Sequence, residues 1–194
     1  GDGDDEVYAR DGLNVDIDGG ADDDTLYIYA FRDGQLSGGA GKDQLTATIS
    51  NKGVYTLDGG EGDDTLKIRG SYTRLDRGGN EANLRGGKGN DTIEITDDHA
   101  GSTSDSDGNQ YGIVKAVIDG GEGQDTITVS GGLDVSITTG ANSDTVALTA
   151  HQFRTFKEGP RIVKNDDGSS DIVDAKPIHI TDFTTGESGD VLDY

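Results

Sequence analysis

The chain of 194 residues carries 38 acidic and 16 basic side chains, which gives a formal net charge of −22 at neutral pH. It contains no cysteine, so a disulfide framework and thiolate metal sites are excluded. Only 30% of its residues are hydrophobic, no apolar stretch is long enough for a membrane span, and the acidity disfavours nucleic acid as a partner. Cations are therefore the ligands that the composition favours.

One pattern, Gly-Gly-x-Gly-x-Asp followed by alternating apolar residues, recurs along residues 1–148. Five good copies read GGADDDTLYI, GGAGKDQLTA, GGEGDDTLKI, GGKGNDTIEI and GGEGQDTITV, and degraded copies cover residues 1–9 and 139–148. The aspartates that close the pattern are Asp5, Asp24, Asp43, Asp64, Asp91, Asp125 and Asp144, separated by 19, 19, 21, 27, 34 and 19 residues. A unit of about 19 residues that tolerates insertions predicts stacked coils.

Each unit contains two short strands. After each aspartate, apolar residues alternate with polar ones, as in Leu26 and Ile28, and period two places threonines such as Thr25 on the opposite face. A second row of single apolar residues precedes each glycine pair by two positions: Ile17, Leu36, Leu57, Leu84, Ile118 and Ile137. We therefore predict an all-β, right-handed parallel β-solenoid (β-roll) over residues 1–150, with a narrow aliphatic core and almost no helix.

The insertions all fall in one of the two turns of the coil. Residues 31–34, 51–53, 71–83, 97–112 and 131–132 lie between a strand that follows an aspartate and the next glycine pair. We call these turns the variable edge, and the turns that carry the Gly-Gly-x-Gly-x-Asp pattern the constant edge. A constant edge beside a variable one indicates a common ligand at the constant edge.

The constant edge has the chemistry of a calcium site. Stacking at about 4.8 Å places equivalent turns over one another, and glycines aim backbone carbonyls into the gaps where carboxylates gather. Such an all-oxygen site suits calcium better than magnesium, and the metal becomes part of the fold. The gaps between seven turns predict about six ions. The candidate ligands are Asp5, Gly19, Asp22, Asp24, Gly38, Asp43, Gly59, Gly60, Gly62, Asp64, Gly86, Gly87, Gly89, Asp91, Gly120, Gly121, Gly123, Asp125, Asn142 and Asp144.

The pattern resembles the calcium-binding nonapeptide repeats of RTX (repeats-in-toxin) proteins, which Gram-negative bacteria secrete through type I machinery. The resemblance covers about residues 1–148. It implies a non-enzymatic module that is exported without an N-terminal signal peptide and folds on calcium outside the cell or at its surface. RTX rolls usually carry the nonapeptide at both turns, whereas this chain carries it at one, so we expect one calcium row.

Two parent proteins fit this resemblance. The longer unit with one patterned edge is similar to the repeat tracts of large RTX adhesins. The alternative is the folding and secretion scaffold of a secreted hydrolase or toxin. The chain begins Gly-Asp-Gly without Met, so we expect it to be a piece of a longer protein whose neighbouring sequence distinguishes the two.

Residues 151–194 lack the repeat and contain both prolines and three of the four phenylalanines. A solenoid needs a cover on its open end, so we expect this segment to be a C-terminal cap. Its last 17 residues, IHITDFTTGESGDVLDY, resemble the stretch that follows the repeats in RTX proteins. Asp182 and Asp190 in this stretch are either ligands of a further calcium ion or part of a simple capping strand.

Other chemistries are weakly supported. His99, His151 and His179 share no metal-ligand spacing, and no serine lies in a nucleophile motif, so we expect no enzyme. Residues 103–108 and 163–168 imitate the start of an EF-hand loop but lack aspartate at its first position. Glycan binding by the longest loops of the variable edge, 71–83 and 97–112, remains an alternative, because long loops often carry binding sites.

Overall fold

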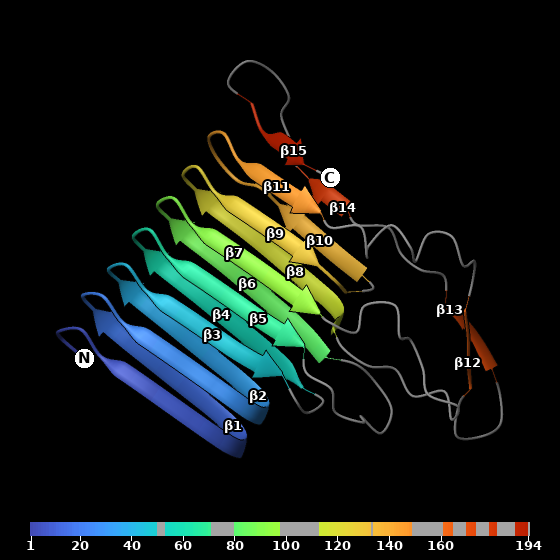
Figure 1. Cartoon of the computed structure of the whole chain (residues 1–194), viewed down its shortest axis with the longest axis horizontal. Coiled ribbons are helices and arrows are strands. Elements are labelled where there is room, and N and C mark those ends of the chain that lie inside the picture. The colour runs from blue at the N-terminus through green and yellow to red at the C-terminus, as the bar shows by residue number, and fades with distance from the viewer. Residues whose placement is uncertain are drawn as a thin grey trace.

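The computed structural model describes residues 1–49, 53–70, 80–97, 113–132, 134–148, 161–164, 170–173, 179–181 and 189–193. Every regular element in these ranges is a β-strand, and none of them is a helix. Thirteen strands form one all-parallel sheet, and two others form a separate antiparallel pair (Figure 1). Within the described ranges there is accordingly no helix suited to crossing a membrane. The all-β prediction is confirmed.

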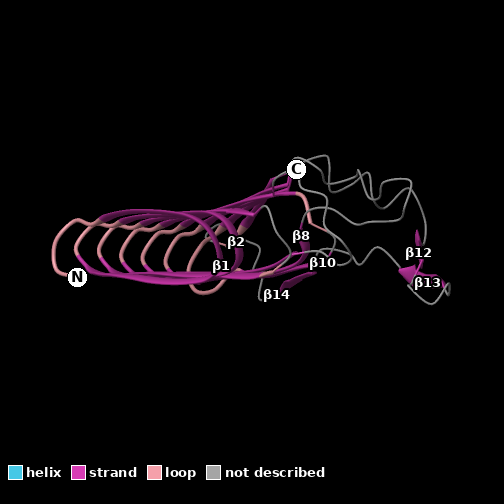
Figure 2. Ribbon diagram, turned by 90° about the horizontal axis from the view of Figure 1, so that it is seen from below, coloured by secondary structure: helices cyan, strands magenta, loops and turns pink. Residues whose placement is uncertain are grey.

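The parallel strands form two flat layers that face each other across a thin core (Figure 2). Two long strands, β1 (Glu6–Ala21) and β2 (Thr25–Ala40), contribute to both layers. The first layer continues with β3 (Gln44–Ile49), β5 (Thr65–Gly70), β7 (Thr92–Asp97), β9 (Thr126–Ser130), β11 (Thr145–Leu148) and β15 (Val191–Asp193). The second layer continues with β4 (Val54–Glu61), β6 (Asn80–Lys88), β8 (Ile113–Glu122), β10 (Asp134–Thr138) and β14 (His179–Thr181).

Successive coils pair in the register that the repeat predicts. In the first layer Leu26 lies opposite Leu45, and Leu45 lies opposite Leu66. In the second layer Leu36 lies opposite Leu57, which lies opposite Leu84. The unequal spacing of the repeat does not disturb the pairing of these rows, and a register shift between Asn80 and Glu81 of β6 lies at the variable edge. This arrangement confirms the parallel solenoid.

The core consists of the predicted inward-facing residues. Leu26, Leu45, Leu66, Ile93 and Ile127 are fully buried, and each stacks on its equivalent in the neighbouring coil. Each coil buries these side chains only against its two neighbours and the opposite layer, as expected of a repeat protein.

Two features of the fold differ from the sequence prediction. The first two coils do not contain two short strands each, because β1 and β2 run without a break around the variable edge. Their repeats have the minimal spacing of 19 residues, and residues 31–34, expected to be an insertion, are part of β2. Later coils are split into two strands, including the 19-residue coil of β9 and β10, in which Gly131 and Gly132 lie between the strands.

The second difference concerns the C-terminal segment. β14 pairs with β10, and β15 pairs with β11, so these strands add one more coil to the same sheet. Between β11 and β14 lie β12 (Arg161–Lys164) and β13 (Ser170–Val173), which pair with each other. The three phenylalanines of the expected cap, Phe153, Phe156 and Phe183, lie outside the described residues, and the boundary at residue 150 stays a prediction.

Candidate metal centre

A continuous ladder of eight aspartates follows the constant edge. In each step, the backbone N–H of one aspartate donates to Oδ1 of the equivalent aspartate in the next coil. The N···O distance is 2.8 Å from Asp5 to Asp24 and 2.9 Å from Asp144 to Asp190. The residues of this ladder, which we call the ladder aspartates, are Asp5, Asp24, Asp43, Asp64, Asp91, Asp125, Asp144 and Asp190.

Backbone hydrogen bonds also join the ladder aspartates to the following coil. The carbonyl of Asp24 accepts from the N–H of Gln44, and the carbonyl of Asp43 accepts from the N–H of Thr65, both at 2.8 Å. Each of these aspartates thus joins its two neighbouring coils through its main chain and its side chain. A change at one ladder position therefore affects the gaps on both of its sides.

The second carboxylate oxygen is the unusual feature of the ladder. In Asp24, Asp43, Asp64, Asp91 and Asp125, Oδ2 is buried and has no hydrogen-bond partner. A buried, unpaired carboxylate oxygen is costly and needs a compensating group. The repetition of this arrangement in five coils makes an accidental defect a poor explanation.

Each of these oxygens lies beside the first glycine of its own repeat. A Cβ atom added at Gly59 would lie 2.4 Å from Oδ2 of Asp64 and 2.5 Å from the carbonyl oxygen of Gly86 in the next coil. The two oxygens are therefore less than about 5 Å apart, and calcium, which binds oxygen at about 2.3–2.6 Å, can bridge such a pair. Gly86 stands in the same relation to Asp91 and Gly120.

The second and third glycines of the repeat meet a backbone requirement. Gly60 and Gly62 have φ values of 112° and 130°, which side chains rarely adopt. A Cβ at Gly60 would lie 2.1 Å from the carbonyl oxygen of Gly39 in the preceding coil. In two copies, Asp22 and Asn142 replace the third glycine and keep a positive φ of 76° and 81°, as these residue types tolerate.

A second, exposed ladder was not predicted. It lies one residue before the ladder aspartates, and its bonds run in the opposite sense, so that a side-chain oxygen accepts from the following coil. Asp23 Oδ1 accepts from the N–H of Lys42, and Asp63 Oδ1 accepts from that of Asn90, both at 2.7 Å. This position holds Asp, Lys, Asn, Gln or Ser in different copies, so the sequence gives no signal for it.

Burial makes the charged form of the central ladder aspartates, Asp43, Asp64, Asp91 and Asp125, unfavourable. It raises the pKa of Asp64 to about 6, that of Asp91 to about 7 and that of Asp125 to about 6. Neighbouring carboxylates raise these pKa values further, whereas the backbone N–H that each Oδ1 accepts opposes the increase. A proton or a cation at Oδ2 removes the cost of burying this negative charge, so protons and cations compete for the same oxygen atom.

The donor set fits a cation bound largely by main-chain oxygen. Within the described ranges, no three acidic or histidine side chains gather closely enough to hold a metal by themselves. A cation at the ladder would instead take a buried Oδ2 and carbonyl oxygens from adjacent turns. This oxygen set suits calcium and does not suit metals that prefer nitrogen or sulfur.

The other predicted ligands fall into clear groups. Gly19, Gly38, Gly59, Gly86 and Gly120 are buried beside the ladder, and Gly87, Gly89, Gly121 and Gly123 have positive φ. Asp190 takes the eighth ladder position, with Val191 N–H donating to the Asp144 carbonyl at 2.6 Å. Asp182, His99, His151 and the EF-hand-like loop 103–108 lie outside the described residues, as do residues 165–168 of the other loop. His179 is exposed on β14.

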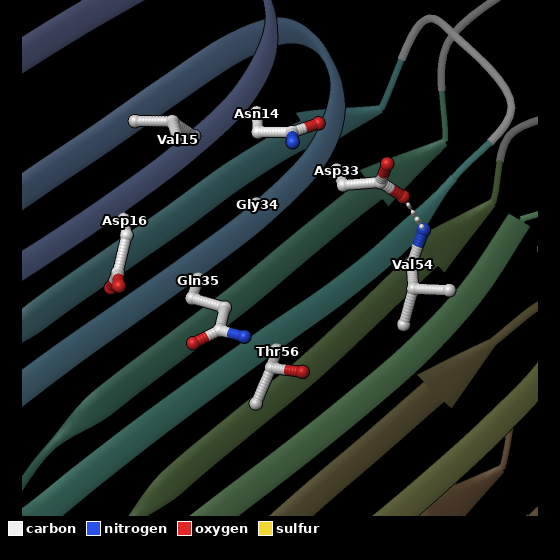
Figure 3. Close-up of a pocket in the computed structure, with 8 residues that line it drawn as sticks. All are labelled: Asn14, Val15, Asp16, Asp33, Gly34, Gln35, Val54 and Thr56. Carbon is white, nitrogen blue, oxygen red and sulfur yellow. Dashed lines mark hydrogen bonds between the residues drawn. The ribbon is translucent and has the colours of Figure 1, made fainter.

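A cavity separate from the ladder lies on one outer flat face of the solenoid (Figure 3). Its volume is about 370 Å³, and it lies over β1, β2 and β4, on the outer side of the second layer. Its lining residues are Asn14, Val15, Asp16, Asp33, Gly34, Gln35, Val54 and Thr56. Asp33 Oδ1 accepts from the N–H of Val54 at 2.9 Å, which joins two coils near the variable edge.

Comparison of the chain with known protein families, with curated proteins and with solved structures found no match. The fold and the aspartate ladder therefore carry the functional argument.

Proposed function

We propose that the chain is a calcium-binding structural module of a secreted RTX-type protein, which folds when calcium enters the gaps between its stacked turns. The row of buried, unpaired Oδ2 atoms beside carbonyl oxygens of the next coil carries this proposal. Calcium supplies the positive charge that this row lacks. The eight ladder aspartates enclose seven gaps, one more than the seven repeats in the sequence indicate.

Calcium concentration then controls folding. At the low calcium of a bacterial cytosol, a chain of net charge −22 repels itself and stays expanded, which suits export through type I machinery. Millimolar calcium outside the cell fills the gaps, and the binding free energy becomes folding free energy. The module acts without catalysis, in an adhesin-like protein or as the scaffold of a secreted hydrolase or toxin.

Circular dichroism and small-angle scattering during a calcium titration test this function. We expect an expanded chain with little β-structure in excess chelator at neutral pH, and a compact β-rich chain at millimolar calcium. Magnesium at equal concentration is the matched control and is expected to be much less effective, because it keeps its waters. A compact, β-rich chain in chelator at pH 7.5 or above would contradict the proposal.

A further inference from the structure

The two outer faces of the solenoid differ in charge. The outward positions of the first layer, from β1 to β9, are nearly neutral, whereas those of the second layer, from β1 to β10, are strongly acidic. The charged residues of the first layer are Glu6 and Glu94 against Arg10, Lys67 and Arg69. Those of the second layer are Asp16, Asp18, Asp33, Asp58, Glu81, Asp119 and Asp134 against Arg85 and Lys115.

The neutral face carries an aromatic cluster at its N-terminal end, formed by Tyr8, Arg10, Tyr27 and Tyr29, which we call the tyrosine platform. Tyr8 lies opposite Tyr27, and Arg10 lies opposite Tyr29, in adjacent coils. The ring centroids of Tyr8 and Tyr27 are 5.8 Å apart, and the Arg10 guanidinium carbon lies 5.2 Å from the centre of the Tyr29 ring. These contacts hold four large side chains together on one flat surface.

Packing in the core does not account for these tyrosines. Tyr8 remains 64% exposed, and all three rings are on the side of the strand that faces away from the core. In the next coil, the positions opposite Tyr27 and Tyr29 hold Thr46 and Thr48, and threonine favours strands and suits an outward position. Aromatic side chains gathered on a surface, rather than scattered singly, are typical of binding sites.

We propose that the tyrosine platform binds a neutral glycan. A pyranose ring has an apolar face of C–H groups that stacks on an exposed aromatic ring, while its hydroxyls accept hydrogen bonds from Arg10 and exchange them with phenolic hydroxyls. Tyr27 Oη already lies 3.2 Å from Thr48 Oγ1, which places hydroxyl groups beside the rings. A neutral ligand suits the balanced charge of this face, whereas the net charge of −22 repels acidic glycans.

The rings of adjacent coils lie side by side, so the platform favours a chain of sugars over a single one. This ligand would bind along the stack and would not need the loops of the variable edge. Because it lies away from the ladder aspartates, its binding tests a different property from calcium-dependent folding. The protein is therefore first folded with calcium, and the circular dichroism spectrum is recorded before any sugar is added.

The experiment is a titration of the calcium-loaded chain with cellohexaose, mannohexaose and chitohexaose, followed by tyrosine fluorescence and calorimetry. The chain contains no tryptophan, so tyrosine emission is observed without interference from that residue. We expect at least one hexasaccharide to bind and the double variant Tyr8→Thr/Tyr27→Thr to weaken its affinity at least about tenfold. Threonine is the residue of the next coil in this column, so the variant should retain its fold.

The variant Gln35→Ala, in the cavity of the opposite face, is the matched control and should bind the sugar as the unaltered chain does. Three results would overturn the proposal: no binding of any hexasaccharide, equal binding by the double variant, or loss of binding in Gln35→Ala alone. Sedimentation of the unaltered chain and of the double variant, both without sugar, tests whether a second copy of the chain binds at the platform instead. Self-association that only the double variant loses, without sugar binding, would assign the platform to a second copy of this chain.

Discussion

The constant and variable edges solve the same problem of reversing the chain, but in opposite ways. At the constant edge, the described turns repeat one set of hydrogen bonds, and each turn after the first buries one carboxylate. At the variable edge, β1 and β2 turn without a break, whereas later coils accept insertions. The difference shows that the stack fixes one edge through contacts between neighbours, and leaves the other free to change.

A matched pair of substitutions tests this contrast most strongly. Asp64 and Asp33 both accept a backbone N–H from an adjacent coil, at 2.8 and 2.9 Å, but Asp64 is buried at the constant edge. In calcium, Asp64→Ala should lower the free energy of unfolding by about 3 kcal/mol, since it leaves the N–H of Asp43 buried without a partner and removes a calcium ligand. Asp33→Ala should cost about 0.5–1 kcal/mol.

Chemical denaturation with saturating calcium measures both values, and calorimetry counts the ions. Asp64→Ala should also reduce the calcium bound, since its coil borders two gaps. Equal costs for the two variants, together with unchanged calcium binding, would remove the distinction between the edges.

The pH dependence of stability separates the edges in a second way. The folded-state pKa values of Asp64, Asp91 and Asp125 are raised to between about 6 and about 7, above the usual value of 3.8. Without calcium, their contribution is fully present below about pH 4 and is lost as the pH rises through about 6 to 7. In chelator the free energy of unfolding should therefore fall as the pH rises from about 4 to about 7, whereas calcium affinity should rise.

Circular dichroism in chelator, which reports the folded fraction, and calcium titrations, both between pH 4 and 8, measure these opposite trends. Asp91→Asn is the control, because it is neutral throughout. It should stabilise the calcium-free chain at pH 8 and weaken calcium binding there. Stability in chelator that increases from pH 4 to 8 would contradict the burial of ionisable carboxylates at the constant edge.

Ion pairs between coils are expected to have the smallest effect. Lys67 Nζ lies 3.2 Å from Glu94 Oε2, and Lys88 Nζ lies 2.5 Å from Glu61 Oε1, on exposed surfaces of adjacent coils. Lys67→Ala should lower the free energy of unfolding by about 0.5 kcal/mol, and high salt should remove most of this effect. A cost comparable with that of Asp64→Ala would show that surface charge, rather than the ladder, holds the coils together.

The sequence was sufficient to predict the inward residues and the main ladder, because each depends on a short repeat. Leu26 and Ile28 follow Asp24 at fixed positions, and stacking makes every copy equivalent. The exposed ladder at Asp23 and Asp63 was missed because the residue type at its position changes from copy to copy, so no fixed residue marks it in the sequence.

The position of Asp190 could not be decided from the sequence either. Asp190 is 46 residues from Asp144, and its place in the ladder depends on β14 and β15 returning to the sheet over that distance. The sequence offered a calcium ligand and a capping strand as alternatives. The structure places Asp190 in the ladder and, directly after it, a strand that extends the solenoid.

A structure from crystals grown in millimolar calcium, with the anomalous signal of calcium recorded, tests the central claim most directly. The account predicts a single row of calcium ions along the constant edge, each about 2.3–2.6 Å from an Oδ2 atom of a ladder aspartate and from carbonyl oxygens of the next turn. A folded chain in calcium whose buried Oδ2 atoms contact no metal would contradict it.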